Sequence, residues 1–340
     1  MTRSSTIPRL PAVRDLTVDQ ALAWYAALPS KSRPGQHGGA APAAADPMAP
    51  TSWSAFIGQE PVVTDLQVRA RAAKARCSAM ASTLVVACPG SGKSTLARLV
   101  AVELGRPLVE LKKPVDTPRL ARMLADAGPM PVLHVDEVHL WPRGTGQHDL
   151  MQLIEDGQLE AAGRTYRLPD VTVLASTTNP EALVGPLVDR MAARPVFVPY
   201  TTLDMELIVS GMALRAGLDL DIVTRTYQAT LGAAAAGSPR AARRLVQATL
   251  DLHDAGQPCD DLATLRFAGV EPDGMTRNHL AYLSALTGAT RPVGESALAR
   301  MIGLPIAMIR DLEDLLLARG LIVLTGRGRQ ITAAGAARVP

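Results

Sequence analysis

Cysteine and long apolar runs are scarce in this sequence, and each scarcity excludes a class of protein. The three cysteines, Cys77, Cys88 and Cys259, are odd in number and lack the spacing of metal ligands, so they indicate neither a disulfide framework nor a zinc site. No run approaches the roughly 18 apolar residues that a membrane span requires. The first residues, MTRSSTIPRLPAVRD, lack the apolar core of a secretory signal, which predicts a cytoplasmic protein without a membrane partner.

Lysine is scarce as well, and the charge balance limits the nucleic-acid contacts that the chain can make. Only five of its 35 lysine and arginine residues are lysines, and the formal net charge is +3. We interpret the arginine excess as the coding bias of a GC-rich gene. Because this net charge is far below that of proteins that coat nucleic acid through bulk charge, any DNA contact is expected to be local.

The 340 residues are enough for two or three compact cores, preceded by an N-terminal extension. Residues 1–50 hold a candidate helix over 17–28. The stretch that follows this helix is rich in proline, glycine and alanine, which is typical of a flexible linker.

Residues 51–200 alternate short apolar runs with helical stretches. This alternation predicts an α/β domain in which helices cover both faces of a mostly parallel sheet. Residues 201–268 lose the strand pattern and are predicted to form a helical lid, and residues 269–340 are predicted to form a C-terminal domain. The expected strands are 83–87, 107–111, 131–135, 171–176 and 195–199.

A glycine-rich segment, ACPGSGKS at 87–94, lies between an expected strand and an expected helix. Its glycines allow backbone N–H groups to approach a phosphate chain at the N-terminus of the helix. Lys93 would reach the β- and γ-phosphates, and the Ser94 hydroxyl would bind Mg²⁺. Ala87 stands where this P-loop pattern prefers glycine, at a position that mainly shapes the turn. The residues predicted to bind nucleotide here are Pro89, Gly90, Ser91, Gly92, Lys93, Ser94 and Thr95.

Two adjacent carboxylates, Asp136 and Glu137, end the apolar run VLHV. Such residues could merely cap a strand and meet solvent. With a P-loop about 40 residues earlier, the pattern favours catalysis, with Asp136 on the metal side and Glu137 polarising the attacking water.

Three further polar residues follow later elements. Thr178 follows the next expected strand, where a side chain could sense the attacking water. Arg190 ends a short predicted helix, from which it could pair with Asp189 or reach a neighbouring subunit's γ-phosphate. Arg240, in GSPR, opens a helix that Ser238 could cap, and would point back across the nucleotide.

The C-terminal segment has the pattern of a winged helix. Residues 296–304 and 305–321 predict helix, glycine turn and helix, and LIVLTGRGRQIT predicts a hairpin with the tip GRGR. Arg327 and Arg329 at that tip are expected to contact DNA phosphates without sequence preference and in a salt-sensitive way. Docking of another protein is the alternative use of such a domain.

The order of these motifs resembles AAA+ ATPases, and more narrowly the RuvB family of motors that drive branch migration of Holliday junctions. The segments that carry the resemblance include FIGQE (56–60), the P-loop, VLHVDEVH (132–139), GSPR (237–240) and TGRGRQIT (325–332).

The resemblance implies ATP and Mg²⁺ as cofactors and a homo-oligomer, a hexameric ring, with nucleotide sites between subunits. It places Ile57 and Gly58 at the adenine and makes Glu137 the catalytic carboxylate. It also makes Thr178 sensor 1, Arg190 the arginine finger and Arg240 sensor 2. The segment AAGRTYRLPD is shorter than the family's hairpin for the junction-binding protein RuvA, which weakens the implied contact with a RuvA-like partner.

The function that this sequence predicts is an ATP-dependent motor that translocates duplex DNA, at Holliday or other branched junctions. One alternative is a DNA-bound ATPase switch or loader, similar to clamp loaders and initiators, that assembles other proteins without translocating. Another is a remodeller of protein substrates whose wing docks a partner.

Overall fold

The computed structural model describes residues 46–161, 163–168 and 170–339, so the predicted helix at 17–28 and the linker after it lie outside the described residues. The chain divides into two compact units. Of the described residues, the first contains those up to Asp204 together with Ser238–Arg240, and the second contains Met205–Gly237 and those from Ala241 on. The boundary predicted between 268 and 269 therefore falls inside the second unit.

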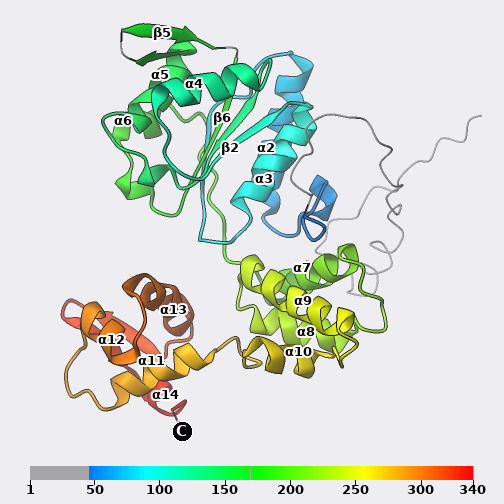
Figure 1. The fold of residues 1–340 in the computed structure, drawn as a ribbon, viewed down its shortest axis with the longest axis vertical. Coiled ribbons are helices and arrows are strands. Elements are labelled where there is room, and N and C mark those ends of the chain that lie inside the picture. The colour runs from blue at the N-terminus through cyan, green and yellow to red at the C-terminus, as the bar shows by residue number, and fades with distance from the viewer. Residues whose placement is uncertain (1–45, 162, 169, 340) are drawn as a thin grey trace, which may run out of the picture. The chain divides into compact units, whose positions relative to one another are not determined.

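The first unit is built on a four-stranded parallel sheet, which confirms the predicted α/β class (Figure 1). Alternate residues of each strand face opposite sides, so that Leu133 and Val135 pack into one apolar cluster and Val132 into the other. In spatial order the strands are β1 (Thr83–Val86), β6 (Thr172–Thr177), β3 (Val132–Val135) and β2 (Leu108–Leu111).

Helices cover both faces of this sheet. The cluster on one face contains buried residues of α2 (Glu60–Ala75) and α3 (Lys93–Leu104). The cluster on the other contains residues of α4 (Thr117–Asp126) and α5 (Gly146–Asp156). Figure 1 shows the sheet between these two helix layers. The remaining elements of the unit are η2 (Trp53–Ala55), η3 (Val138–Leu140), β4 (Gln158–Ala161), β5 (Arg164–Arg167), η4 (Pro180–Ala182) and α6 (Gly185–Asp189).

The strand predicted at 195–199 is not a regular strand. Phe197 N–H donates to Val86 O and Val86 N–H donates to Pro195 O, both at 2.9 Å, but the pairing amounts to isolated bridges. Pro195 has no N–H to donate, so a continuous hydrogen-bond ladder cannot form there. The segment therefore runs beside the edge strand β1 without extending the sheet.

The second unit begins with helices and ends with a winged helix. Its first helices are α7 (Thr202–Arg215, which starts in the first unit), α8 (Arg225–Ala234), α9 (Pro239–Asp254) and α10 (Asp261–Ala268). The winged helix consists of α11 (Arg277–Thr287), α12 (Glu295–Ile302), α13 (Ile306–Ala318), β7 (Ile322–Thr325), β8 (Gly328–Ile331) and α14 (Ala333–Ala336).

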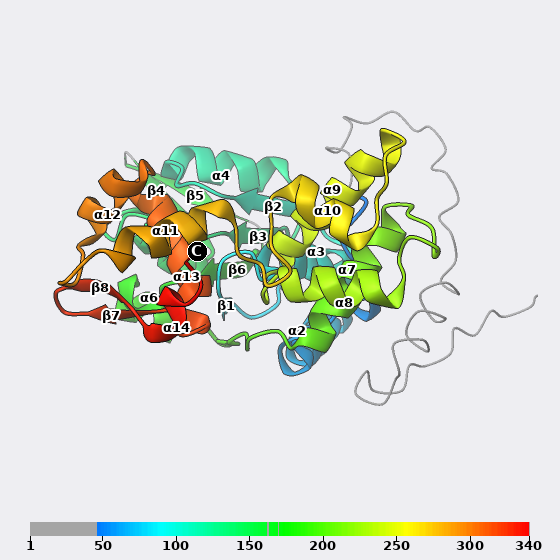
Figure 2. The ribbon, with the colours of Figure 1, turned by 90° about the horizontal axis from the view of Figure 1, so that it is seen from below.

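The winged helix has an apolar core of its own, to which α11, α12 and α13 contribute Leu283, Leu298 and Ile309. The strands β7 and β8 pair as an antiparallel hairpin (Figure 2). The predicted order of helix, glycine turn, helix and hairpin is thus confirmed. No helix in the described part of the chain is long and apolar enough to cross a lipid bilayer.

The start of α11 depends on a neutral histidine. Thr276 N–H donates to His279 Nδ1 at 3.0 Å as part of a capping box. Burial lowers the pKa of His279 from 6.5 to about 4. A proton on Nδ1 would remove the acceptor of this hydrogen bond.

We therefore expect the second unit to lose stability on mild acidification. Because the folded-state pKa of His279 lies below its unfolded value, the unfolded chain binds the proton first. Stability is fully present above pH 6.5 and declines as the pH falls towards 4, by at most about 3 kcal/mol. Urea unfolding at pH 7 and pH 5 measures this loss. His279→Gln keeps an acceptor without titrating, so equal pH dependence in both proteins would contradict the assignment.

Candidate nucleotide site

The predicted nucleotide residues meet at one edge of the sheet. The P-loop follows β1, Asp136 and Glu137 follow β3, and Thr178 follows β6. These strands are parallel and adjacent in the order β1, β6, β3, so their carboxyl ends lie side by side. Such an edge is where open α/β sheets bind ligands.

The P-loop backbone has the geometry of an anion cradle. Gly90 and Gly92 have φ of 74° and 108°, conformations that side chains rarely adopt. Gly92 is the N-cap of α3 and no side chain caps this helix, so the N–H groups of its first turn are available to phosphate oxygens. The ring of Phe56 lies next to Gly92, and Tyr200 donates its hydroxyl hydrogen to Ser91 O at 2.8 Å.

Lys93 supplies a buried positive charge at this cradle. Its side chain is only 6% exposed, and Nζ donates to Ala87 O at 3.2 Å, to Cys88 O at 3.4 Å and to Glu137 Oε1 at 3.0 Å. A buried ammonium group is stable only with such oxygen partners. Phosphate oxygens are of the same chemical kind, so the residues present fit the predicted nucleotide.

Glu137 is held by donors from α3 and from the residue after β6. Its Oε2 accepts hydrogen bonds from the N–H of Thr178 at 3.0 Å and from Thr178 Oγ1 at 2.9 Å, and His139 Nδ1 lies 3.2 Å away. The backbone of Glu137 has φ of 48°, which is uncommon outside glycine and asparagine. The structure thus brings Lys93 and Thr178 together around the carboxylate of Glu137.

The two residues predicted to bind Mg²⁺ carry oxygen donors. Asp136 and Ser94 are both half-buried, and Asp136 Oδ1 accepts a hydrogen bond from Ser176 Oγ at 2.9 Å. Within the described residues no three histidine, cysteine or acidic side chains cluster as a metal site. Hydroxyl and carboxylate oxygens suit Mg²⁺, which keeps several waters and is bound through one or two protein oxygens and substrate phosphates.

Ile57 and Gly58, predicted to contact the adenine, are both buried near the same edge. Gly58 has φ of 72°, and a Cβ there would lie 3.0 Å from the ring of Tyr200. Burial and the charge of Asp204 raise the pKa of Tyr200 far above its usual range, so its hydroxyl stays protonated and remains a donor.

The two predicted arginines of the site differ in their surroundings. Arg240, the second residue of α9, is exposed, and its Cβ lies close to Gly90, where an added Cβ would approach it to 2.7 Å. Arg190 follows α6, and its guanidinium binds Glu155 Oε1 at 2.7 Å and Pro186 O at 2.8 Å. The ion-pair partner of Arg190 is therefore Glu155 and not Asp189.

The predicted tip of the wing, the hairpin of β7 and β8, differs from the observed one. Only Gly326 and Arg327 lie between β7 and β8, and Arg327 is exposed at this tip. Arg329 lies within β8, is 17% exposed and binds Glu313 Oε1 at 2.7 Å, with Glu295 at 3.6 Å. The prediction that Arg329 lies at the tip is wrong, because β8 begins at Gly328; its guanidinium is paired with two carboxylates of the same domain, and its contact with DNA stays a prediction.

Sequence reasoning missed several residues of the site. Tyr200 follows the extended segment beside β1, and its position before a helix start was the only signal. His139 was not predicted as a site residue, yet its Nδ1 lies 3.0 Å from Thr177 Oγ1 and near Glu137. Ser176 was not predicted either, although it donates to Asp136. These contacts join residues far apart in sequence.

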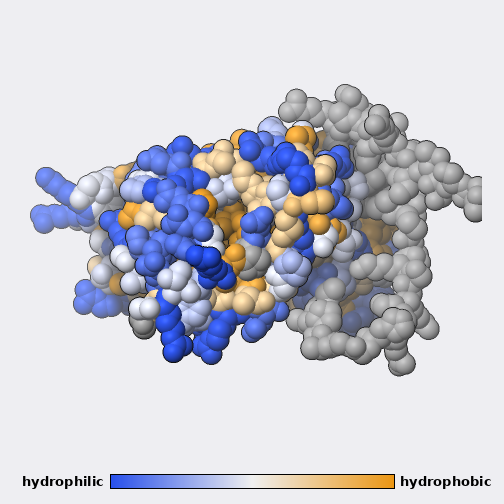
Figure 3. All heavy atoms as spheres, turned by 90° about the horizontal axis from the view of Figure 1, so that it is seen from above, coloured by the Kyte–Doolittle hydropathy of each residue, from blue (hydrophilic) through white to orange (hydrophobic). Residues whose placement is uncertain are grey.

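The hairpin of β4 and β5 is as short as the sequence indicated, with four residues in each strand. Arg164, Thr165 and Arg167 of β5 are exposed. Figure 3 views the molecule from above, the side on which β5 lies in Figure 1, and shows mainly hydrophilic side chains on the left of this face. The exposed part of β5 is therefore polar and cationic.

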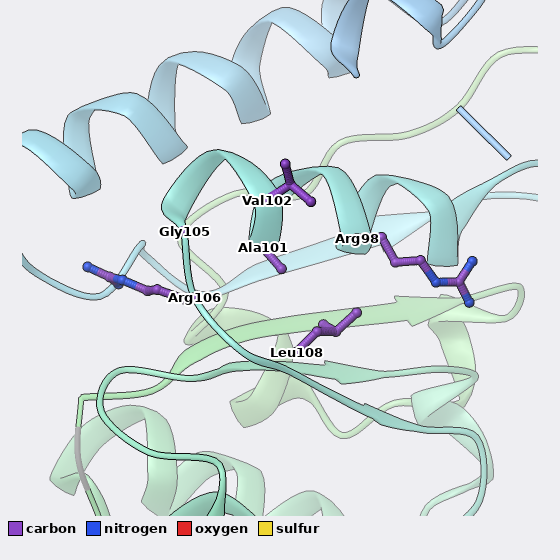
Figure 4. A pocket seen from close by; sticks show the side chains of 6 residues that line it. All are labelled: Arg98, Ala101, Val102, Gly105, Arg106 and Leu108. Carbon is purple, nitrogen blue, oxygen red and sulfur yellow. The ribbon is translucent and has the colours of Figure 1, made fainter. Parts of the chain in front are cut away.

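A shallow depression of about 380 Å³ lies elsewhere on the unit, between the end of α3 and the start of β2 (Figure 4). Because β2 begins there, the depression lies at the opposite edge of the sheet from the P-loop. Figure 4 shows Arg98 and Arg106 at its two ends with Val102 between them. It is therefore separate from the nucleotide residues.

Known families match both ends of the described chain. The protein-family model described as "Holliday junction DNA helicase RuvB P-loop domain" matches residues 48–195. The family model described as "RuvB C-terminal winged helix domain" matches residues 272–339.

Whole-length relatives agree with these matches. The Holliday junction branch migration complex subunit RuvB of Granulibacter bethesdensis is 33% identical over 305 residues, which cover 84% of each chain. That of Chloroflexus aggregans is 32% identical over 301 residues, covering 83% of this chain and 85% of its own. The solved structure of the Thermotoga maritima RuvB Holliday junction branch migration motor has a TM-score of 0.73 and 25% identity, covering 86% of this chain and 100% of its own. This chain therefore belongs to the RuvB family of AAA+ ATPases.

Proposed function

We propose that this protein is a RuvB-type, ATP-driven DNA motor that acts at Holliday or other branched junctions in the cytoplasm, as a hexameric ring. The observation that carries the proposal is the contact of Glu137 with both Lys93 and Thr178 beside an uncapped helix N-terminus. A phosphate-binding cation, a carboxylate and a polar sensor then share one site. The winged helix on the same chain supplies a DNA-binding element.

Each residue has a role that follows from its position. The first turn of α3 and Lys93 bind the β- and γ-phosphates, and Ser94 and Asp136 would hold Mg²⁺, which neutralises charge on the phosphates when bound. Lys93 Nζ donates a hydrogen bond to Glu137 Oε1. When Nζ binds a phosphate oxygen instead, Oε1 can accept a hydrogen bond from the attacking water. Thr178 continues to hold Oε2, which keeps the carboxylate oriented.

Arg190 and Arg240 complete the proposed machinery. Arg240 lies against Gly90 of the P-loop, where it can contact phosphate of its own subunit. Arg190 pairs with Glu155, and we assign it to the γ-phosphate bound by the next subunit of the ring. With each nucleotide shared by two subunits, hydrolysis can be coupled to movement between them.

The wing tip is proposed to contact the DNA backbone. Arg327 is exposed at a two-residue turn, whereas Arg329 holds β8 to α13 through Glu313. An exposed arginine at the wing tip suits contacts to DNA phosphates, and such contacts carry no sequence information. In the proposed ring, six such arginines would surround the duplex.

The experiment that tests this function measures ATP hydrolysis and dissociation of a synthetic four-way junction, with linear duplex as the comparison. We expect the junction to separate into two duplexes only with hydrolysable ATP. Hydrolysis that is stimulated by DNA without any dissociation of the junction would indicate the loader or switch instead. The absence of DNA stimulation would refute the proposal.

Arg327→Ala is expected to weaken DNA binding equally for all sequences and to reduce the slope of binding against salt concentration by about one per subunit. The physical reason is the loss of one phosphate contact and of the counterion that it releases. Fluorescence anisotropy at several salt concentrations measures both quantities. Arg266→Ala removes the same charge from the exposed surface of α10 and should change neither quantity; a loss confined to one DNA sequence would argue against backbone contact.

A further inference from the structure

Polar side chains occupy the interior of the sheet beneath α3, where strand residues are normally apolar. His134 is 0% exposed and Ser176 is 1% exposed. Glu110 of β2 lies directly opposite His134 in the parallel register. Ser176 lies two residues beyond Leu174, the partner of His134 in β6, so both side chains share one face.

These residues form a chain of contacts that ends at Asp136. His134 Nε2 lies 3.1 Å from Ser176 Oγ, and Ser176 Oγ donates to Asp136 Oδ1 at 2.9 Å. A hydroxyl has one hydrogen, and this one points to the carboxylate. Ser176 Oγ therefore accepts its hydrogen bond from His134, which means that Nε2 carries a proton.

The far side of His134 faces another carboxylate. His134 Nδ1 lies 3.6 Å from Glu110 Oε1, and Glu110 is in turn bound by Arg98 at 3.2 Å. The contacts with His134 and Arg98 lower the pKa of Glu110 to about 2, against the effect of burial. Glu110 therefore stays ionised beside the imidazole, but His134 Nδ1 makes no hydrogen bond within the described residues.

A polar pair inside an apolar sheet costs free energy unless its hydrogen bonds are satisfied. Two apolar residues of similar volume would fill the same space without that cost. What the polar pair adds is a hydrogen bond to one oxygen of Asp136, which restricts the rotation of that carboxylate. Residues that hydrogen-bond to a metal ligand typically orient it, and their loss lowers the affinity for the metal.

We propose that Ser176 and His134 are positioning residues that orient Asp136 for the metal ion of the nucleotide complex. This inference rests on the proposed function, because it requires Asp136 to act on the metal side. It adds two residues to the site that have no contact with the reacting groups. Their effect is expected on metal binding and not on binding of the nucleotide itself.

The test uses the full chain and Mn²⁺ as a paramagnetic probe in place of Mg²⁺. Electron paramagnetic resonance titration gives the Mn²⁺ dissociation constant with bound ADP, and a fluorescent ADP analogue in EDTA gives nucleotide affinity without metal. Ser176→Ala should weaken Mn²⁺ binding about tenfold and leave the affinity in EDTA unchanged. Ser210→Ala is the matched control, because Ser210 is also buried but its Oγ makes no hydrogen bond within the described residues.

A second pair of variants keeps Ser176 in place. His134→Leu should weaken Mn²⁺ binding as Ser176→Ala does, whereas His134→Gln, whose amide can still donate to Ser176 Oγ, should restore most of it. This pair decides the question if Ser176→Ala does not fold, as judged by circular dichroism.

Unchanged Mn²⁺ affinity in folded Ser176→Ala, or equal losses in His134→Leu and His134→Gln, would overturn the inference. A different result would overturn the proposed function: an unaltered protein that binds no ADP in EDTA and no Mn²⁺ with ADP. The two failures are thus distinguishable.

Discussion

Glu137→Gln is expected to bind ATP about as well as the unaltered protein and to hydrolyse it about 100 to 10,000 times more slowly. The glutamine amide has the shape of the carboxylate and can still accept from Thr178, but it cannot take a proton from water. General-base catalysis contributes an acceleration of this size. Equilibrium binding of a fluorescent ATP analogue and single-turnover phosphate release measure the two quantities separately.

The control for this variant is Glu160→Gln, which removes the same charge from an exposed position of β4. It should leave hydrolysis unchanged. Because Glu137 is an ion-pair partner of the buried Lys93, thermal unfolding of both variants should be recorded. Undiminished hydrolysis in folded Glu137→Gln would show that another group activates the water.

Arg190→Ala is expected to reduce turnover by about a thousandfold or more while ATP affinity stays nearly unchanged. The guanidinium would contact the γ-phosphate only in the transition state, where arginine fingers act most strongly. Steady-state phosphate release and equilibrium ATP binding are the measurements. Arg122→Ala, an exposed arginine of α4, is the matched control and should behave as the unaltered protein.

Mixing the variants tests whether Arg190 acts on a neighbouring subunit. A Lys93→Ala subunit lacks the phosphate-binding cation but still carries Arg190, and an Arg190→Ala subunit has the opposite defect. A mixed ring therefore contains some sites with both groups, and activity should exceed that of either variant alone. No recovery in rings of confirmed mixed composition, or full activity in a strictly monomeric protein, would refute a site shared between subunits.

The features that could be predicted from the sequence depend on residues that are close together along the chain. Gly90 and Gly92 allow the left-handed turns of the P-loop, and the apolar runs before the loop and before Asp136 form buried strands. The helix, turn and hairpin of the winged helix are local in the same sense. Such patterns predict elements and their order, because backbone conformation and burial periodicity are read within one segment.

The wing shows where local reasoning stops. GRGR was expected to form the tip, but the hairpin closes with the two residues Gly326 and Arg327. The extra two residues belong to β8, where the side chain of Arg329 meets Glu313, a residue 16 positions earlier. Hairpin register depends on turn geometry and on the core that each strand must cover, and the sequence alone does not specify both.

Local patterns along the chain specify a P-loop, two adjacent carboxylates at the end of a strand and a winged helix. Which side chains contact one another depends on the folded arrangement: Lys93 meets Glu137, 44 residues away, Arg190 meets Glu155, and His134 meets Ser176, 42 residues away. Two of these contacts depend on the spatial order of β1, β6 and β3, and the contact of Arg190 with Glu155 depends on the packing of α5 against α6; no single segment encodes either arrangement. Strand order follows from the packing of the whole domain, and with it the hydrogen bonds that orient each side chain.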